Sequence, residues 1–179
     1  MRFIITIFAF MTLSMPALAG PEAFHAGTAI PAFGKIADVK SDLPIPANEV
    51  FKVRFDISKG GKAEQVNRQL ESVARFINMH VAAGMSEDNI QLAVVLHGKG
   101  AMDVTRDEYY STQHEHAQNA NIDLVEALVA HKVRFYVCGQ TAAYYGIGNE
   151  DLLPGVNMAL SAMTAHAVLN NEGYALNPF

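Results

Sequence analysis

The strongest constraint on the fold of this 179-residue chain is a regular alternation of short apolar runs with helical patterns. Runs rich in β-formers occupy residues 49–57, 90–96 and 133–137, and the second of them is nearly all apolar. From Val66 to Val81, apolar residues recur at the spacing of one helical face. Strands that alternate with helices indicate a parallel sheet between two helical layers. We therefore predict an α/β fold with a mainly parallel sheet of four or five strands.

The same alternation continues to the end of the chain. The further predicted elements are a helix over residues 122–129, a short helix directly after Cys138, a strand over 156–159, a helix over 162–169 capped by Ser161, and a strand over 173–176. Residues 101–118 are polar and fit neither the strand period nor the helix period.

Residues 1–19 have the residue order of a secretory signal peptide. A basic start precedes an uncharged apolar run that ends near Met15, and small residues follow at Ala17 and Ala19. An uncleaved anchor or a buried strand is the alternative interpretation. We predict cleavage near Ala19–Gly20, a periplasmic or secreted protein, and no stable membrane insertion afterwards, because no other run has the length of a membrane helix.

The residues that follow divide into an arm and a domain. Residues 20–48 hold four prolines and little apolar periodicity, which indicates a proline-rich N-terminal arm that either wraps the domain or stays mobile. The α/β domain is predicted over residues 49–179.

Composition excludes some functions and leaves others open. The 13 Lys and Arg residues are scattered and the formal net charge is -5, so we expect no nucleic-acid partner. Cys138 is the one cysteine, so it cannot form an internal disulfide. In an oxidising compartment such a thiol is buried and inert, paired between chains, or kept for its reactivity.

Two candidate catalytic residues follow predicted strands. His97 comes after the strand 90–96, and Cys138 comes after the strand 133–137. The carboxyl ends of parallel strands meet at one edge of the sheet, where ligands bind, so these side chains are expected at the same edge. His97 would act as a general acid or base or pair with the thiolate; a histidine bound to loop backbone is the alternative.

The residues around Cys138 favour a negative charge on its sulfur. Free amide groups at the start of the following helix would stabilise a thiolate or a persulfide, and Gly139 would let the backbone approach a sulfur substrate. Gly98, Gly139, Gln140 and Thr141 are the predicted ligand-binding residues. A small buried cysteine without chemistry is the alternative.

Other motifs give no cofactor or metal prediction. His114 and His116 lie two residues apart, a spacing that needs an irregular loop to chelate, so we expect no metal. Gly60-Gly61-Lys62 is interpreted as a turn, because it lacks the spacing of a phosphate loop.

The segment Val133–Thr141, with sequence VRFYVCGQT, resembles the strand-to-cysteine motif of the DsrE/DsrF-like family. The stretch Leu153–Val156, the stretch Ala159–Thr164 and the strand before Gly98 extend this likeness over about residues 49–177. The resemblance implies a flavodoxin-like three-layer sandwich, a homo-oligomer (trimer or hexamer), and a sulfur-relay role in which Cys138 carries a persulfide. Thr141 stands where serine is common in the family, and the export signal departs from its cytoplasmic relay members.

Three functional hypotheses follow. The first is a periplasmic sulfur carrier or sulfurtransferase-like protein whose partners are a sulfur donor or acceptor protein or a small sulfur compound. The alternative is a non-catalytic, oligomeric module that binds a small ligand at the same strand-edge pocket. The third is an oligomeric scaffold in which Cys138 is buried.

Overall fold

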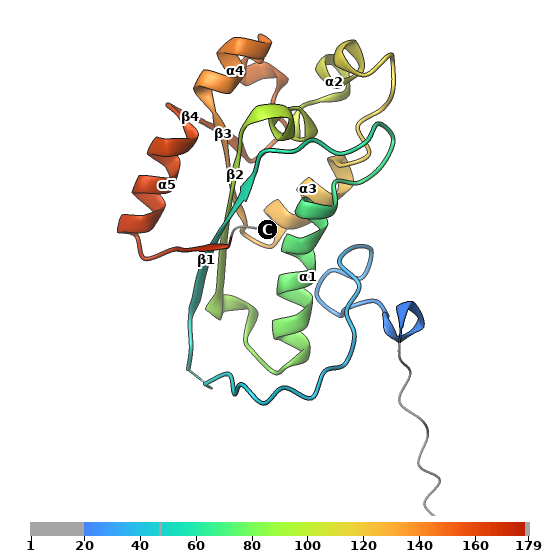
Figure 1. Ribbon diagram of the computed structural model, residues 1–179, viewed down its shortest axis with the longest axis vertical. Helices are drawn as coiled ribbons and strands as arrows, with labels where there is room; N and C mark the ends of the chain where they lie inside the picture. Colours follow the sequence, from blue (N-terminus) through green and yellow to red (C-terminus); the bar gives the residue numbers. More distant parts are fainter. Residues whose placement is uncertain (1–19, 47, 178–179) are drawn as a thin grey trace, which may run out of the picture.

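The computed structural model describes residues 20–46 and 48–177, and it has a five-stranded sheet in which every strand pair is parallel (Figure 1). The strand order is β4-β3-β2-β1-β5. The strands are β1 (Phe51–Ile57), β2 (Ile90–Leu96), β3 (Arg134–Cys138), β4 (Val156–Ala159) and β5 (Ala175–Asn177). The α/β fold with a parallel sheet is therefore confirmed, and it is consistent with a flavodoxin-like sandwich. The predicted signal peptide, residues 1–19, lies outside the described residues.

The helices that connect the strands agree with the sequence pattern except in one segment. They are α1 (Arg68–Ala82), α2 (Asp107–Gln113), α3 (Ile122–Ala130), α4 (Gly139–Tyr145) and α5 (Ala162–Asn171), and the short 3-10 helices are η1 (Pro21–Ala23), η2 (Glu87–Asn89), η3 (Gly98–Val104) and η4 (Asn149–Asp151). The segment that fitted neither period, residues 101–118, holds most of η3 and all of α2. Both are seven residues long, too short to show a clear helical face.

Two helical layers cover the sheet, as Figure 1 shows. Helices α1 and α3 lie on one face, and α5 lies on the other. The strands supply the main core through alternate residues, such as Phe55 and Ile57 of β1, which point toward α1 and α3. The opposite face is smaller, and there Val95 packs with Leu169 and Tyr174. Because this second apolar core is smaller, the face beneath α5 has room for polar side chains of β1 and β3.

Part of the proline-rich arm packs against α1. Asn78, fully buried on that helix, accepts a hydrogen bond from the backbone N–H of Ile30 and donates to the carbonyls of Ile30, Phe33 and Gly34. Ile30 and Ile36 are buried as well. A buried amide that satisfies the arm's backbone groups ties residues 30–36 to the domain.

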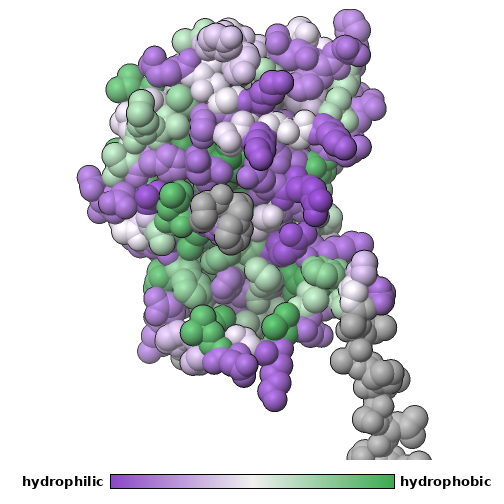
Figure 2. Space-filling model, in the orientation of Figure 1, coloured by the Kyte–Doolittle hydropathy of each residue, from purple (hydrophilic) through white to green (hydrophobic). Residues whose placement is uncertain are grey.

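The surface of the domain is mixed in character. Figure 2 shows hydrophilic residues over much of one face, with apolar residues in separate small patches. Among the residues that the structure describes, no helix is both long enough and apolar enough to span a bilayer.

Candidate functional site

The sheet register brings His97 and Cys138 side by side. Leu96 pairs with Val137 across β2 and β3, so the two residues that follow are neighbours at the carboxyl edge. Leu96 and Val137 point into the core beneath α1 and α3. Because strand side chains alternate, His97 and Cys138 both face the layer of α5. Adjacent strands are about 4.8 Å apart, which brings the two backbones close together.

Cys138 lies where two helices begin. Its residue exposure is 7 %, so Cys138 is buried. The backbone N–H groups of Thr141, Ala162 and Gln140 and the hydroxyl of Thr141 are donors near the sulfur, although the Cys138 side chain makes no cap hydrogen bond to α4. Burial raises the pKa of the Cys138 thiol, but these donors outweigh it and hold that pKa below its ordinary value. Ala162 is the first residue of α5, a donor that the sequence analysis did not identify.

The predicted ligand-binding residues lie around this sulfur in different roles. The hydroxyl of Thr141 lies near it, and its oxygen accepts from the N–H of Gly98 at 3.3 Å, which ties the loop after β2 to α4. Gly98 has a positive φ of 51°, a conformation that favours glycine. Gln140 donates to the carbonyl of Leu160 at 3.2 Å.

Close packing against the end of β4 requires a glycine at position 139. A Cβ at this position would lie 2.6 Å from the carbonyl oxygen of Ala159 and 3.1 Å from that of Leu160. The missing side chain therefore lets the end of β4 approach α4, which in turn brings the start of α5 toward Cys138.

His97 contacts an unpredicted group of polar residues beneath α5. Its Nε2 lies 3.1 Å from Oδ1 of Asp56, and Nε2 of His166 lies 3.0 Å from the same oxygen. Nδ1 of His166 accepts from Nε of Arg54 at 3.2 Å. His166 points from α5 toward the sheet, and its side chain is 23 % exposed. We call Arg54, Asp56, His97 and His166 the Asp56 cluster.

A small groove lies between α5 and strands β3 and β4. It has a volume of about 190 Å³, and Cys138 is not among the residues that line it. Tyr136, two residues before Cys138 on the same strand face, lines it together with Ala159, which pairs with Cys138 in the sheet. Leu160 borders the groove, and Leu160 and the neighbouring Met163 are largely exposed.

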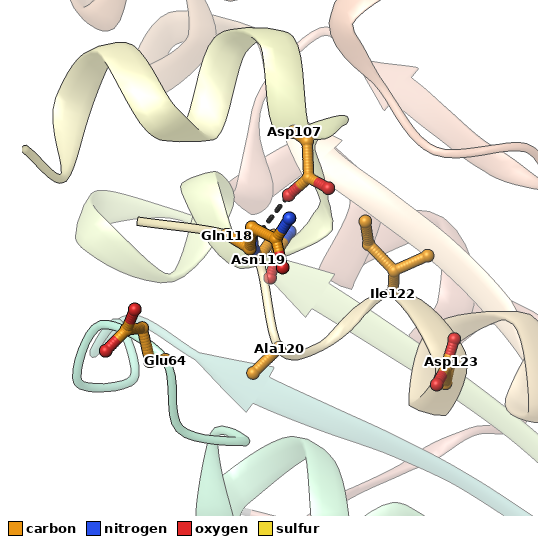
Figure 3. Close-up of a pocket in the computed structure, with 7 residues that line it drawn as sticks. All are labelled: Glu64, Asp107, Gln118, Asn119, Ala120, Ile122 and Asp123. Atoms are coloured by element: carbon orange, nitrogen blue, oxygen red, sulfur yellow. Dashed lines mark hydrogen bonds between the residues drawn. The ribbon is translucent and has the colours of Figure 1, made fainter. Parts of the chain in front are cut away.

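The larger pocket in Figure 3 lies elsewhere and suits sulfur anions less well. It has a volume of about 420 Å³ and is formed by the loop between α2 and α3. Its lining includes the carboxylates of Glu64, Asp107 and Asp123, which lie on three sides of the opening (Figure 3). Oδ1 of Asp107 already accepts from the N–H of Asn119 at 2.6 Å. The negative lining disfavours an anion in this pocket.

Residues 20–46 and 48–177 contain no group of three or more His, Cys, Asp or Glu side chains arranged to hold a metal. His114 stacks on Tyr110, and its Nδ1 lies 3.1 Å from the carbonyl of that residue, while His116 is exposed. In the Asp56 cluster, Arg54 occupies the lone pair of Nδ1 on His166. Nε2 of a neutral ring then carries the proton and cannot ligate a metal.

Known proteins resemble this chain in sequence and in fold. The model of the DsrE/DsrF-like family matches residues 53–178. The solved structure of MTH1491 from Methanobacterium thermoautotrophicum, described as a protein of unknown function, is 23% identical, has a TM-score of 0.51, and covers 72% of this chain and 99% of its own. The ychN protein from E. coli is 18% identical, with a TM-score of 0.49 and coverages of 73% and 100%. No curated protein matches the chain.

At such identity the likeness to MTH1491 supports the fold alone. The family match carries more weight, because it spans well over half of the chain and includes Cys138 and the strands on both sides of it. The chain therefore belongs to the DsrE/DsrF-like family.

Proposed function

We propose that this protein is an exported sulfur carrier in which Cys138 holds sulfane sulfur as a persulfide. The observation that carries the proposal is the set of donors around the sulfur, three backbone N–H groups and the hydroxyl of Thr141. These donors favour a thiolate, which is the nucleophile in sulfur transfer. The link of the DsrE/DsrF-like family to sulfur relay supports the same assignment.

The transfer step needs no cofactor. The Cys138 thiolate attacks the outer sulfur of a persulfide R–S–SH, so that a new S–S bond forms as the old one breaks. R–S⁻ leaves with the electron pair and takes a proton from the imidazolium of His97, giving R–SH and Cys138–S–SH. The sulfane sulfur changes carrier without net oxidation or reduction, and an acceptor thiolate reverses the process.

We also propose that the protein is a homo-oligomer. Large apolar side chains are exposed on α4, on α5 and in the loop before α5, at Tyr144, Leu160, Met163 and Val168. A second copy that covered them would remove an apolar surface from water close to Cys138. Light scattering should then give a mass of three or six chains, and Leu160→Lys with Met163→Lys should reduce it.

Export rests on residues 1–19, and a periplasmic or secreted location is part of the proposal. The mature protein purified from its native compartment should begin at Gly20. Intact-mass measurement of that protein should show an adduct of about 32 Da, one sulfur atom, that dithiothreitol removes. A plain or oxidised thiol on every molecule would count against the carrier function.

The alternative of a binding module differs in one outcome. If the amides around Cys138 only hold a small anion, Cys138→Ala should still show a thermal shift with thiosulfate or another sulfur oxyanion. If the protein is a carrier, the substitution removes the atom that forms the bond, and no sulfur adduct forms.

A further inference from the structure

We infer that Asp56, held by His166 and Arg54, positions His97 so that it exchanges a proton with the sulfur group at Cys138. This inference deepens the proposed function and rests on it, because it assigns the residues that make sulfur transfer by Cys138 efficient. Asp56, His166 and Arg54 are positioning residues, since they act through His97.

The three groups form a row across neighbouring strands. Asp56 is on β1, His97 follows β2, and Cys138 ends β3, and all three face the layer of α5. Besides Asp56 on β1 and Cys138 on β3, the titratable side chain that faces His97 is His166 on α5, which meets it at Oδ1 of Asp56. Arg54, two residues before Asp56 on the same face of β1, is the nearby cation.

Hydrogen-bond direction fixes the proton positions behind Asp56. The Nε–H of Arg54 can only donate, so Nδ1 of His166 must accept, and Nε2 of His166 carries the proton. That N–H donates to Oδ1 of Asp56 at 3.0 Å. His166 is thus a neutral bridge between a cation and a carboxylate, and a second proton on it would break the contact with Arg54.

Arg54 is held firmly enough to enforce this arrangement. It is 8 % exposed, Nη1 donates to the carbonyl of Tyr174, and Nη2 donates to Oδ1 of Asn170 at 3.4 Å. Within the described residues it makes no ion pair with a carboxylate. Arg54 therefore interacts with Asp56 indirectly, through the hydrogen bonds that the imidazole of His166 makes to both residues.

The carboxylate in turn sets the proton on His97. Asp56 accepts from Nε2 of His97 at 3.1 Å, so the other ring nitrogen, Nδ1, has the lone pair. Nδ1 makes no hydrogen bond to any residue that the structure describes. When Nδ1 takes the thiol proton, the resulting imidazolium stays beside a carboxylate that stabilises it and fixes the ring. The side chains of His97 and Asp56 are 35 % and 37 % exposed, so protons and substrates can reach them.

A positioned proton donor matters most when the leaving thiolate is strongly basic. An alkyl thiolate needs a proton as it leaves, whereas an aromatic thiolate leaves readily without one. Loss of Asp56 should therefore slow sulfur transfer from an alkyl persulfide more than transfer from an aryl persulfide. A role of Asp56 in folding alone would slow both transfers equally.

The test is sulfur uptake by the full chain from an alkyl persulfide and from an aryl persulfide, followed by intact mass. Asp56→Asn should slow uptake from the alkyl donor about tenfold and from the aryl donor less than about twofold. The matched control is Asp38→Asn, because Asp38 also lies near a histidine, with Oδ1 3.3 Å from Nε2 of His25, far from Cys138 in the chain. Equal slowing with both donors, or no slowing, would overturn the inference.

His166 gives a second and independent variant pair. A glutamine can accept from Arg54 through Oε1 and donate to Asp56 through Nε2, so His166→Gln should behave like the wild type. His166→Ala breaks the bridge and should show the leaving-group dependence of Asp56→Asn. If glutamine is as slow as alanine, His166 does not act as a neutral bridge.

Nuclear magnetic resonance separates failure of this inference from failure of the proposed function. Long-range ¹H–¹⁵N spectra at neutral pH should show His166 with its proton on Nε2, whether or not Cys138 takes up sulfur. A proton on Nδ1 of His166 would contradict the arrangement directly. No uptake by the wild type, together with the expected His166 tautomer, would refute the carrier function while leaving the proton assignment intact.

Discussion

Two polar regions at the carboxyl edge of the same sheet differ in burial. The asparagine network, Asn67, Asn119, Asn121, Asp103 and Thr105, lies between 0 and 4 % exposed. The cysteine site, Cys138 with the Asp56 cluster, combines a buried cysteine with imidazole and carboxylate groups that are 23 to 37 % exposed.

The asparagine network connects neighbouring loops through hydrogen bonds from side chains to backbone groups. Asn121 accepts from the N–H of Asn67 at 2.7 Å, and Asn119 donates to the carbonyls of Asp103 and Thr105 at 3.1 and 2.7 Å. Gly61 also donates to Asp103 within this network, so that amide of the glycine turn is already used. Groups that are buried and paired stabilise the fold, whereas groups left open to solvent beside a nucleophile can exchange protons and ligands. The comparison predicts that substitutions in the two regions have opposite effects.

The largest expected effect is on sulfur uptake. Cys138→Ser should abolish formation of the 32 Da adduct, about one sulfur atom, because a hydroxyl does not form the persulfide. The midpoint of thermal unfolding should shift by no more than about 2 °C, since the side chains are similar in size. Uptake by the serine variant would mean that sulfur binds elsewhere, and intact mass with peptide mapping decides this.

Asn67→Ala, in the asparagine network, should lower stability and leave sulfur uptake unchanged. It removes the side chain that caps α1 by accepting from the N–H of Gln69 and that donates to the carboxylate of Asp103 at 2.6 Å. Because a buried charge loses a partner, the free energy of unfolding measured in urea should be lower than that of the wild type by about 2–4 kcal/mol. The exposed Asn48→Ala is the control. Sulfur uptake by the folded Asn67→Ala chain should stay normal. A loss of uptake without a loss of stability would contradict this separation of the two regions.

Asp103 gives the network a pH dependence. Burial raises the pKa of this carboxyl above its usual 3.8, although Asn67 and Gly61 donate to it. A raised folded-state pKa contributes stability at low pH, and that stability is lost as pH rises through the folded-state value. Asp103→Asn stays neutral, so its stability relative to the wild type should grow from pH 4 toward pH 7 in urea unfolding. A constant difference over that range would contradict burial as the dominant cause.

The smallest predicted effect concerns one donor at the cysteine site. Thr141→Val removes the hydroxyl that helps to lower the pKa of Cys138 and leaves the backbone donors in place. The midpoint of Cys138 alkylation should move to higher pH, and Thr141→Ser should restore it. An unchanged midpoint for valine would show that the backbone N–H groups alone hold the thiolate.

The sequence predicted the strands and most of the helices because local periodicity encodes them. Cys138 and His97 were also predictable, since each follows an apolar strand. Asp56, Arg54 and His166 were missed because their contacts join residues 41 to 112 positions apart. A signal for two of them was present, because Arg54 and Asp56 alternate with Val53, Phe55 and Ile57 and so share the second face of β1.

The donors around Cys138 show the same limit. The N–H groups of Gln140 and Thr141 follow from a helix that starts after the cysteine, and the sequence pattern predicts that helix. The N–H of Ala162 reaches the sulfur only because β4 pairs with β3 and Gly139 allows close approach. Such a contact depends on strand order, which periodicity does not specify.

The central claim is that the sulfur of Cys138 is held as an accessible anion by hydrogen-bond donors from α4 and α5. The pH dependence of its alkylation by iodoacetamide in the folded chain measures this most directly. The account predicts a single reactive thiol whose rate reaches half of its plateau below 9.0, the ordinary thiol value. A midpoint at or above that value, or a thiol that reacts only after unfolding, would contradict it.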